Sequence, residues 1–210
     1  FLDTFKTFFK KERILTILFF ILLFRMPEAF LSKVTELFLI DTQQDGGLGL
    51  SPQEFGLVQG TVGAIGVSLG GLLGGFVVSR GGLKRWLWPM TAAYTLPALV
   101  YVFMGYELPS SLMIINFCVF FEQFGYGFGL TAYMLYLIYI SRGDYQTSHY
   151  SIVSALMSLS MMLPGLFAGA LQEAMGYRYF FVFVLICSPI SFLVVSALHL
   201  DDDFGRQEDY

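Results

Sequence analysis

Long apolar stretches separated by short polar turns dominate this chain. A bilayer-spanning helix needs about 20 predominantly apolar residues, and none of these stretches shows the strict alternation typical of a strand. Six of them are predicted to be membrane-spanning helices: residues 13–41, 53–79, 85–105, 109–141, 147–175 and 178–199. Ser51-Pro52-Gln53-Glu54 predicts the start of the second helix, because it joins a capping box to a proline at the first helical position.

The two ends of the chain differ from this apolar body. Residues 1–12 are predicted to form an amphipathic, lysine-containing lead-in at the cytoplasmic surface, and residues 13–200 the membrane domain. Residues 201–210 are predicted to be an acidic cytoplasmic tail surrounded by solvent. The chain starts at Phe1 rather than at a methionine, so we expect a fragment of a longer protein.

Basic residues near the segment ends predict the orientation of the helices. Nine of them fall on one side of the membrane, and only Arg178 falls on the other. The positive-inside rule therefore places both termini in the cytoplasm. The nine residues are Lys6, Lys10, Lys11, Arg13, Arg80, Lys84, Arg85, Arg142 and Arg206.

Composition narrows the class of protein. Hydrophobic residues make up 56% of the chain and charged residues 13%, against about 25% charged in soluble proteins, so an integral membrane protein is predicted and a nucleic-acid partner is not. Cys118 and Cys187 lie in apolar runs and suggest neither a disulfide nor a metal site. Without a catalytic triad pattern, metal-ligand spacing or phosphate loop, neither an enzyme nor a cofactor is expected.

Charged residues inside the first segment are the main functional signal. Arg25, Glu28, Lys33 and Glu36 lie on one broad face of the predicted helix. A charge at the centre of a membrane helix costs roughly 2.5–3.5 kcal/mol on insertion scales, so such residues usually face a protein interior or a watery pathway. A transport pathway for ions or substrate is therefore predicted beside this helix.

The first and fourth segments share this anomaly, which suggests an inverted repeat of three plus three helices. Arg25 and Glu28 flank Pro27, while Glu122 and Gln123 precede a run of glycines. Buried polarity beside a helix interruption at matching positions points to a transporter binding site. We therefore expect segments one and four to line a polar groove and segments three and six to face lipid.

Small and flexible residues in the second and fifth segments are interpreted as packing residues. Glycines spaced along the second segment would let two helices approach closely, and methionine fills irregular gaps in a protein interior. The residues concerned are Gly60, Gly63, Gly66, Gly70, Gly74, Met157, Met161 and Met162.

One short stretch resembles a loop of a known family. Gly74-Gly75-Phe76-Val77-Val78-Ser79-Arg80-Gly81-Gly82-Leu83-Lys84-Arg85 is similar to the cytoplasmic signature loop of the major facilitator superfamily, found between the second and third helices of each six-helix half. Ser79 stands where the family usually has an acidic residue. The resemblance implies a cytoplasmic gating loop with these residues: Gly75, Ser79, Arg80, Gly82, Lys84 and Arg85.

Two further stretches resemble the C-terminal half of AmpG-type muropeptide permeases. They are Arg25-Met26-Pro27-Glu28-Ala29-Phe30 and the run from Phe120 to Tyr133. The resemblance implies an all-α, six-helix half of a major facilitator fold in the bacterial inner membrane. It further implies proton-driven import of anhydro-muropeptides for peptidoglycan recycling, with the N-terminal six-helix half as the partner. Another cargo, of acetyl-CoA or sugar type, stays open, as does a membrane enzyme or receptor that uses Glu122 as a general acid.

The resemblance also suggests roles for the intramembrane residues. Arg25 is expected to hold a substrate carboxylate through its planar guanidinium. The alternative is an internal ion pair between Arg25 and Glu28, three residues apart, that only makes insertion of the helix into the membrane tolerable. Glu122 is expected to load and release protons, because its helix offers no basic partner within reach, whereas Glu28 is expected to stay charged. An alternative role for Glu122 is a hydrogen bond between helices. The remaining predicted substrate-binding residues are Lys33, Gln59, Gln123, Tyr126 and Tyr133.

Overall fold

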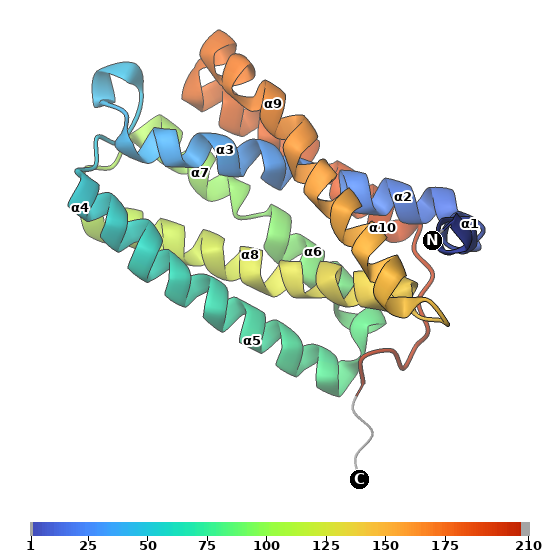
Figure 1. Cartoon of the computed structure of the whole chain (residues 1–210). Coiled ribbons are helices and arrows are strands. Elements are labelled where there is room, and N and C mark those ends of the chain that lie inside the picture. The colour runs from blue at the N-terminus through green and yellow to red at the C-terminus, as the bar shows by residue number, and fades with distance from the viewer. Residues whose placement is uncertain (1, 207–210) are drawn as a thin grey trace.

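The computed structural model describes residues 2–206 and is helical throughout, with no strand in that range (Figure 1). Phe1 and the acidic residues Glu208 and Asp209 of the predicted tail lie outside the described residues. The elements are α1 (Leu2–Phe9), α2 (Ile14–Leu23), α3 (Met26–Ile40), the 3₁₀ turn η1 (Gln43–Asp45), α4 (Pro52–Phe55), the π-helix η2 (Gly56–Gly63), α5 (Ala64–Gly81), α6 (Leu83–Thr95), α7 (Ala98–Glu107), α8 (Leu112–Ser141), α9 (Gln146–Cys187) and α10 (Pro189–Ser196).

Each predicted apolar segment is helical in the structure. By length and composition, five helical stretches of the described residues could cross a membrane, and the last runs from Gln146 to Ser196. That stretch has 51 residues and contains a non-helical residue, Gly176, with φ 74° and ψ 164°. Because glycine adopts positive φ readily, the chain can reverse there, and the stretch forms two antiparallel helices (Figure 1). The six-helix architecture predicted from the sequence is therefore confirmed.

Prolines divide three of the long helices into shorter pieces. Pro27 lies in the first turn of α3, where a proline needs no N–H partner, and the chain is not helical at Phe24 and Arg25. Pro97 separates α6 from α7, and Pro189 begins α10. The break before Pro27 puts Arg25 at the junction of α2 and α3 rather than on the surface of a continuous helix.

Glycines bring α5, α6 and α8 into close contact. A Cβ built at Gly70 would lie 2.1 Å from the Phe124 carbonyl oxygen, and one at Gly125 would lie 2.2 Å from the Ala93 carbonyl oxygen. A Cβ at Gly127 would lie 2.2 Å from the Val67 carbonyl oxygen. The prediction that glycines interrupt the fourth segment is wrong, because α8 runs unbroken from Leu112 to Ser141; these glycines serve close helix packing.

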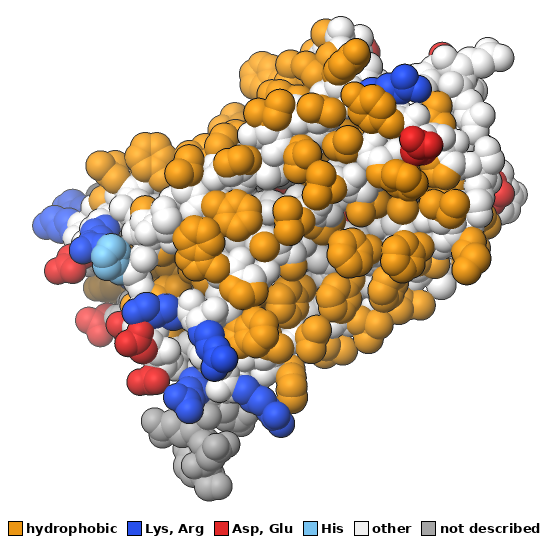
Figure 2. Space-filling view, turned by 180° about the vertical axis from the view of Figure 1, so that it is seen from behind, with side chains coloured by type: hydrophobic (Ala, Val, Ile, Leu, Met, Phe, Trp, Pro, Cys, Tyr) orange, Lys and Arg blue, Asp and Glu red, His pale blue; other side chains and the backbone are white. Residues whose placement is uncertain are grey.

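Two hydrophobic clusters form the interior. One gathers residues of α2, α6, the second half of α8 and the start of α9, and includes Tyr94 and Tyr133. The other gathers residues of α3, α7, the first half of α8 and the end of α9, and includes Tyr101. The outer surface is also mostly hydrophobic on the face shown in Figure 2, where most of the Lys and Arg side chains gather at one end of the molecule. Such a surface suits a protein surrounded by lipid.

The last described residues pack against the bundle, which corrects the expectation of a solvated tail. The carboxylates of Asp201, Asp202 and Asp203 are exposed, but the Phe204 side chain is buried. The Leu83 backbone N–H donates to the Phe204 carbonyl oxygen at 2.8 Å. Hydrophobic burial of Phe204 and this backbone bond hold the tail in place where its charges alone would not.

Candidate functional site

Arg25 lies at the centre of a buried polar group. Its side chain is 6% exposed, although it belongs to a membrane-spanning segment. Nε donates to the Tyr94 hydroxyl at 3.2 Å and Nη2 to the Tyr126 hydroxyl at 3.1 Å, while the guanidinium carbon lies 5.7 Å from the centre of the Tyr133 ring. Two hydroxyls and an aromatic face therefore fix the guanidinium without neutralising its charge.

The helix break at Arg25 frees backbone carbonyls, and two hydroxyls satisfy them. Tyr133 of α8 donates to the Ile21 carbonyl oxygen at 3.0 Å, and Ser191 of α10 donates to the Phe24 carbonyl oxygen at 2.8 Å. Unsatisfied carbonyls cost several kcal/mol in a membrane interior, and side chains of neighbouring helices commonly remove that cost. The break is thus stabilised from α8 and α10.

Glu122 is buried beside two donors. Its carboxylate accepts a hydrogen bond from the Gln123 amide at 2.9 Å and one from the Tyr101 hydroxyl at 3.4 Å, and its side chain is 4% exposed. A buried carboxylate needs such partners in either protonation state. Glu122 therefore lies in a formed polar site rather than facing lipid.

Glu28 has a different environment. Its side chain is 8% exposed, and within the described chain it has neither a hydrogen-bond partner nor an ion pair shorter than 4 Å. The possible Arg25–Glu28 pair is therefore absent, because Arg25 precedes α3 and its guanidinium turns toward the tyrosines. Glu28 still lies close enough to Glu122 and Arg25 for their charges to interact. Beside it is a small cavity of about 10 Å³ bordered by Tyr94, Thr95 and Ser188, close to the size of one water molecule.

An open groove of about 640 Å³ lies next to Arg25. Lys33 lines it from α3, and its methylene groups cross Gly165 of α9, where a Cβ would lie 3.2 Å from Lys33 Cε. The prediction that segments one and four line the groove is therefore wrong in part, because α9 of segment five forms the facing wall. The α9 residues on that wall include the methionines interpreted as packing residues: Met157, Ser158, Met161, Met162, Gly165 and Leu166.

The other predicted substrate-binding residues lie in three places. Tyr126 is half-buried and holds Arg25. Gln59 and Gln123 flank Gly63, within 3.4 Å of the position of its missing Cβ, and neither lines the groove. Tyr133 is fully buried, so its expected contact with substrate is not available in this conformation, since its hydroxyl is committed to Ile21.

The third helical segment supplies residues that the sequence reasoning missed. Tyr94 of α6 and Tyr101 of α7 hold Arg25 and Glu122 respectively, although this segment was expected to face lipid. Its opposite side does face outward through Leu96, Leu99 and Phe103. The two tyrosines are seven residues apart, which places them two turns apart on one face of a helix. This spacing is the signal in the sequence that could have identified them as a pair facing the interior.

The predicted gating loop joins α5 to α6. The Ser79 hydroxyl donates to the Phe76 carbonyl oxygen at 2.8 Å, and the Arg80 guanidinium lies 4.4 Å from the centre of the Phe76 ring. Gly82 has φ 77°, a conformation that favours glycine. The other predicted loop residues are exposed: Gly75, Lys84 and Arg85. The Lys84 ammonium forms an ion pair with Asp202 of the tail.

Comparison with known proteins assigns this architecture to a family. The family model described as Major Facilitator Superfamily matches residues 9–209. AmpG 4 of Rickettsia conorii, named as a transporter, is 28% identical over 195 residues, which cover 92% of this chain and 45% of the relative. AmpG 1 of Rickettsia felis, also named as a transporter, is 25% identical over 182 residues, 87% of this chain and 40% of the relative.

The chain thus spans about half the length of the curated relatives it matches. Among solved structures, the crystal structure of a mutant peptide transporter POT in complex with alafosfalin aligns with a TM-score of 0.69 at 16% identity. The alignment covers 87% of this chain and 37% of that chain. At this identity the likeness shows the fold alone.

Proposed function

Because the chain belongs to the major facilitator superfamily, we propose that it forms the C-terminal half of a proton-coupled transporter that imports anhydro-muropeptides for peptidoglycan recycling. The observation that carries this proposal is the buried guanidinium of Arg25 at the edge of an open groove shared with Lys33. The AmpG-like stretches around Arg25 and Glu122 support the choice of cargo. The N-terminal six-helix half of the same protein is the proposed partner and would form the opposite wall.

Substrate recognition is proposed to begin with charge. Arg25 and Lys33 present two cations to the groove, and a guanidinium can bind a carboxylate through two parallel hydrogen bonds. Ser158 adds a polar contact and the groove methionines adapt to an irregular ligand. Gln59, Gln123 and Tyr126 are proposed as further polar contacts, while Tyr133 positions Arg25.

Proton coupling is proposed to use Glu122 together with Glu28. Two buried carboxylates that interact electrostatically favour sharing one proton over carrying two negative charges. Glu122 has donors that support its ionised form, Tyr101 and Gln123. Glu28 has no such donor among the described residues, so the earlier expectation that Glu28 stays charged loses its support.

The proposed location is the bacterial inner membrane, with both chain termini in the cytoplasm. The basic residues of α1, of the gating loop and of the tail lie near the end of the molecule that carries both termini (Figures 1 and 2). A concentration of Lys and Arg on one side favours the cytoplasmic side. In this orientation the loop from Arg80 to Arg85 is cytoplasmic, which a gating role requires.

Uptake by the full-length protein tests the proposed function. In proteoliposomes, labelled anhydro-muropeptide is expected to accumulate above its external concentration when the outside is acidic, and a protonophore should abolish that accumulation. Excess acetyl-CoA or glucose should not compete. Uptake that is independent of the pH gradient would contradict proton coupling. Competition by acetyl-CoA or glucose would indicate a different cargo.

A further inference from the structure

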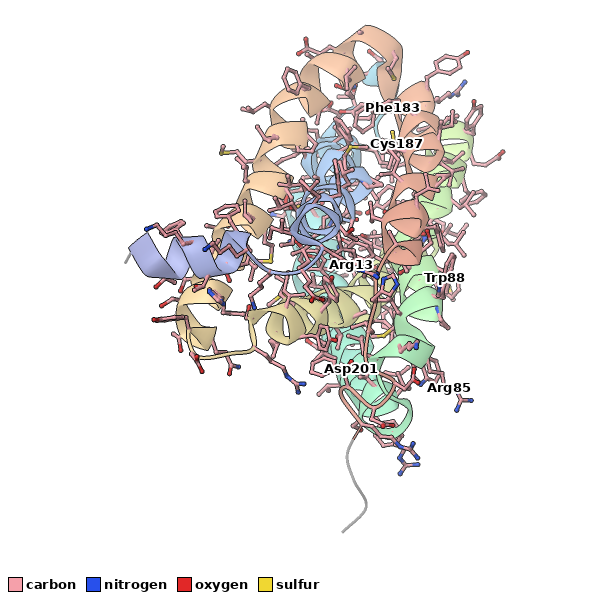
Figure 3. All side chains as sticks on the ribbon, turned by 90° about the vertical axis from the view of Figure 1, so that its right-hand side faces the viewer. Arg13, Arg85, Trp88, Phe183, Cys187 and Asp201 are labelled. Carbon is pink, nitrogen blue, oxygen red and sulfur yellow. The ribbon has the colours of Figure 1, made fainter. Side chains whose placement is uncertain are left out.

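The short helix α1 lies across the bundle at the end that carries both termini. Figure 1 shows α1 almost along its axis and α2 from the side, whereas Figure 3 shows α1 from the side and α2 almost along its axis. The turn between α1 and α2 is made at Arg13, which has φ 57°, a left-handed conformation. If α2 crosses the bilayer, α1 lies in the plane of the membrane surface, as interfacial amphipathic helices do.

Several contacts hold α1 in this position. Phe8 is fully buried against the bundle, and the Thr7 hydroxyl lies 3.1 Å from Nε2 of His149 in α9. The Lys11 ammonium donates to the backbone carbonyls of Ile140 and Arg142 at the end of α8, and partial burial lowers the pKa of Lys11. The position of α1 is therefore set by the protein and does not require a ligand.

Between α1 and the start of α9 lies a second open groove, also of about 640 Å³. Its walls are mostly apolar, with hydroxyls only from Thr4, Ser148 and Ser151. Lys6 on α1 and Lys10 directly after it are exposed and one turn apart, roughly 100° around the helix from the groove residues Phe5 and Phe9. The remaining residues of the groove are Ile152, Ala155, Leu156 and Leu159.

We propose that this groove binds an anionic phospholipid, with an acyl chain between α1 and α9 and the phosphate held by Lys6 and Lys10. From Thr4 to Arg13 the chain carries four basic residues and one acid. A basic segment beside a transmembrane helix attracts anionic lipid headgroups, and the apolar walls match the hydrocarbon below them.

The proposed lipid site does not depend on the transported cargo or on proton coupling. It needs only that the chain is a membrane protein in which α1 lies at the bilayer surface. The other possible occupant is the remaining half of the full-length protein, and the experiment distinguishes the two. A covering protein segment would exclude lipid of every headgroup type.

Native mass spectrometry of the full-length protein in detergent tests the site. The protein is titrated with phosphatidylglycerol or with phosphatidylcholine of the same acyl chains. One tightly retained phosphatidylglycerol is expected at concentrations where phosphatidylcholine is not retained. Each lysine near the surface strengthens binding to anionic lipid by about fivefold, so Lys6→Gln with Lys10→Gln should weaken it roughly 25-fold.

Three further variants separate charge from shape. Lys6→Arg with Lys10→Arg keeps both charges and should bind as the wild type does, and Arg206→Gln removes a basic residue of the same end without affecting the site. Ala155→Trp fills the groove and should abolish retention without changing any charge. Equal retention of the two lipids, or unchanged binding in the Lys6→Gln, Lys10→Gln variant, would overturn the proposal. Both lysines are exposed, so this last outcome stays decisive even if Ala155→Trp fails to fold.

Discussion

At the residue scale, the most informative feature is how Arg25 is held. A buried cation in a membrane segment usually pairs with an acid, yet Arg25 is bound by the hydroxyls of Tyr94 and Tyr126. These neutral partners occupy Nε and one terminal nitrogen, and within the described residues the guanidinium has no ion pair shorter than 4 Å at the edge of the groove. Such a guanidinium is available to bind an anion.

Arg25→Lys is expected to impair substrate affinity while leaving the fold intact. Lysine keeps the charge but cannot hydrogen-bond two tyrosines and a carboxylate in one plane. The Michaelis constant for uptake by the full-length protein should rise about tenfold or more, which corresponds to roughly 1.4 kcal/mol. Glu36→Gln, an exposed charge change on α3, is the control. Wild-type affinity in Arg25→Lys would leave only a structural role for the guanidinium.

Glu122→Gln is expected to separate binding from coupling. The amide keeps the size of the side chain and can still accept hydrogen bonds from Tyr101 and Gln123, but it cannot take up a proton. The variant should exchange labelled substrate across the membrane and fail to accumulate it against a gradient, with protein levels matched. If accumulation is normal, the proton site lies elsewhere, and Glu28→Gln is the next variant to measure.

At the element scale, the break between α2 and α3 depends on other helices for its stability. Pro27 prevents a continuous helix, and the carbonyls of Ile21 and Phe24 are then bonded by Tyr133 and Ser191. Tyr133, whose ring lies beside the Arg25 guanidinium, therefore both supports the break and positions Arg25. Distant helices thus decide whether this functional feature can form.

Tyr133→Phe tests that dependence. Losing one hydroxyl leaves the buried Ile21 carbonyl without its partner, at a cost of about 1–3 kcal/mol. Unfolding by sodium dodecyl sulfate in mixed micelles should show this loss of stability. Ser196→Ala, which removes an exposed hydroxyl from α10, should change stability by less than about 0.5 kcal/mol. Equal stability of the two variants would show that the hydroxyl does not support the break.

Close packing of α5 on α8 leads to a second prediction at this scale. Gly70→Ala would place a methyl group 2.1 Å from the Phe124 carbonyl oxygen, and overpacking of this kind typically costs about 1–3 kcal/mol. Gly75→Ala on the same helix meets nothing within 4 Å and should be neutral or slightly stabilising, because alanine favours helix over glycine. Comparable loss of stability in both variants would argue against the close α5–α8 contact.

At the scale of the whole molecule, the last described residues connect two loops at the same end. Asp202 pairs with Lys84 of the α5–α6 loop, and Phe204 lies beneath Arg142 of the α8–α9 loop, 4.4 Å from the guanidinium carbon to the ring centre. The tail thus joins parts of the chain that the sequence places far apart. An exposed ion pair adds little stability, so burial of Phe204 is the main contribution.

Phe204→Ala is therefore expected to release the tail. Hydrogen exchange should become faster at the Leu83 amide, which donates to the Phe204 carbonyl oxygen, and at residues 200–206. Asp203→Ala, a change of an exposed side chain, serves as the matched control and should leave both regions protected. Unchanged exchange in Phe204→Ala would show that the backbone contact holds without the ring.

The sequence by itself determined the helices and the burial of the intramembrane charged residues. In lipid, the backbone N–H and C=O groups of every segment must be hydrogen-bonded within their own helix. The hydropathy of a segment and its prolines therefore decide locally where a helix forms and where it breaks. The six helices, the break at Pro27 and the buried placement of Arg25, Glu28 and Glu122 could therefore be predicted from residues alone.

Only the tertiary structure decided which side chains meet. Hydropathy does not specify how far a helix rotates about its axis, and that rotation brings Tyr94 and Tyr101 inward from the third segment. It also turns the α9 methionines toward the groove and leaves Glu28 without the Arg25 partner that spacing along a straight helix would have provided. Glycines after Glu122 looked like an interruption because their function, contact with the backbones of α5 and α6, depends on neighbours distant in sequence.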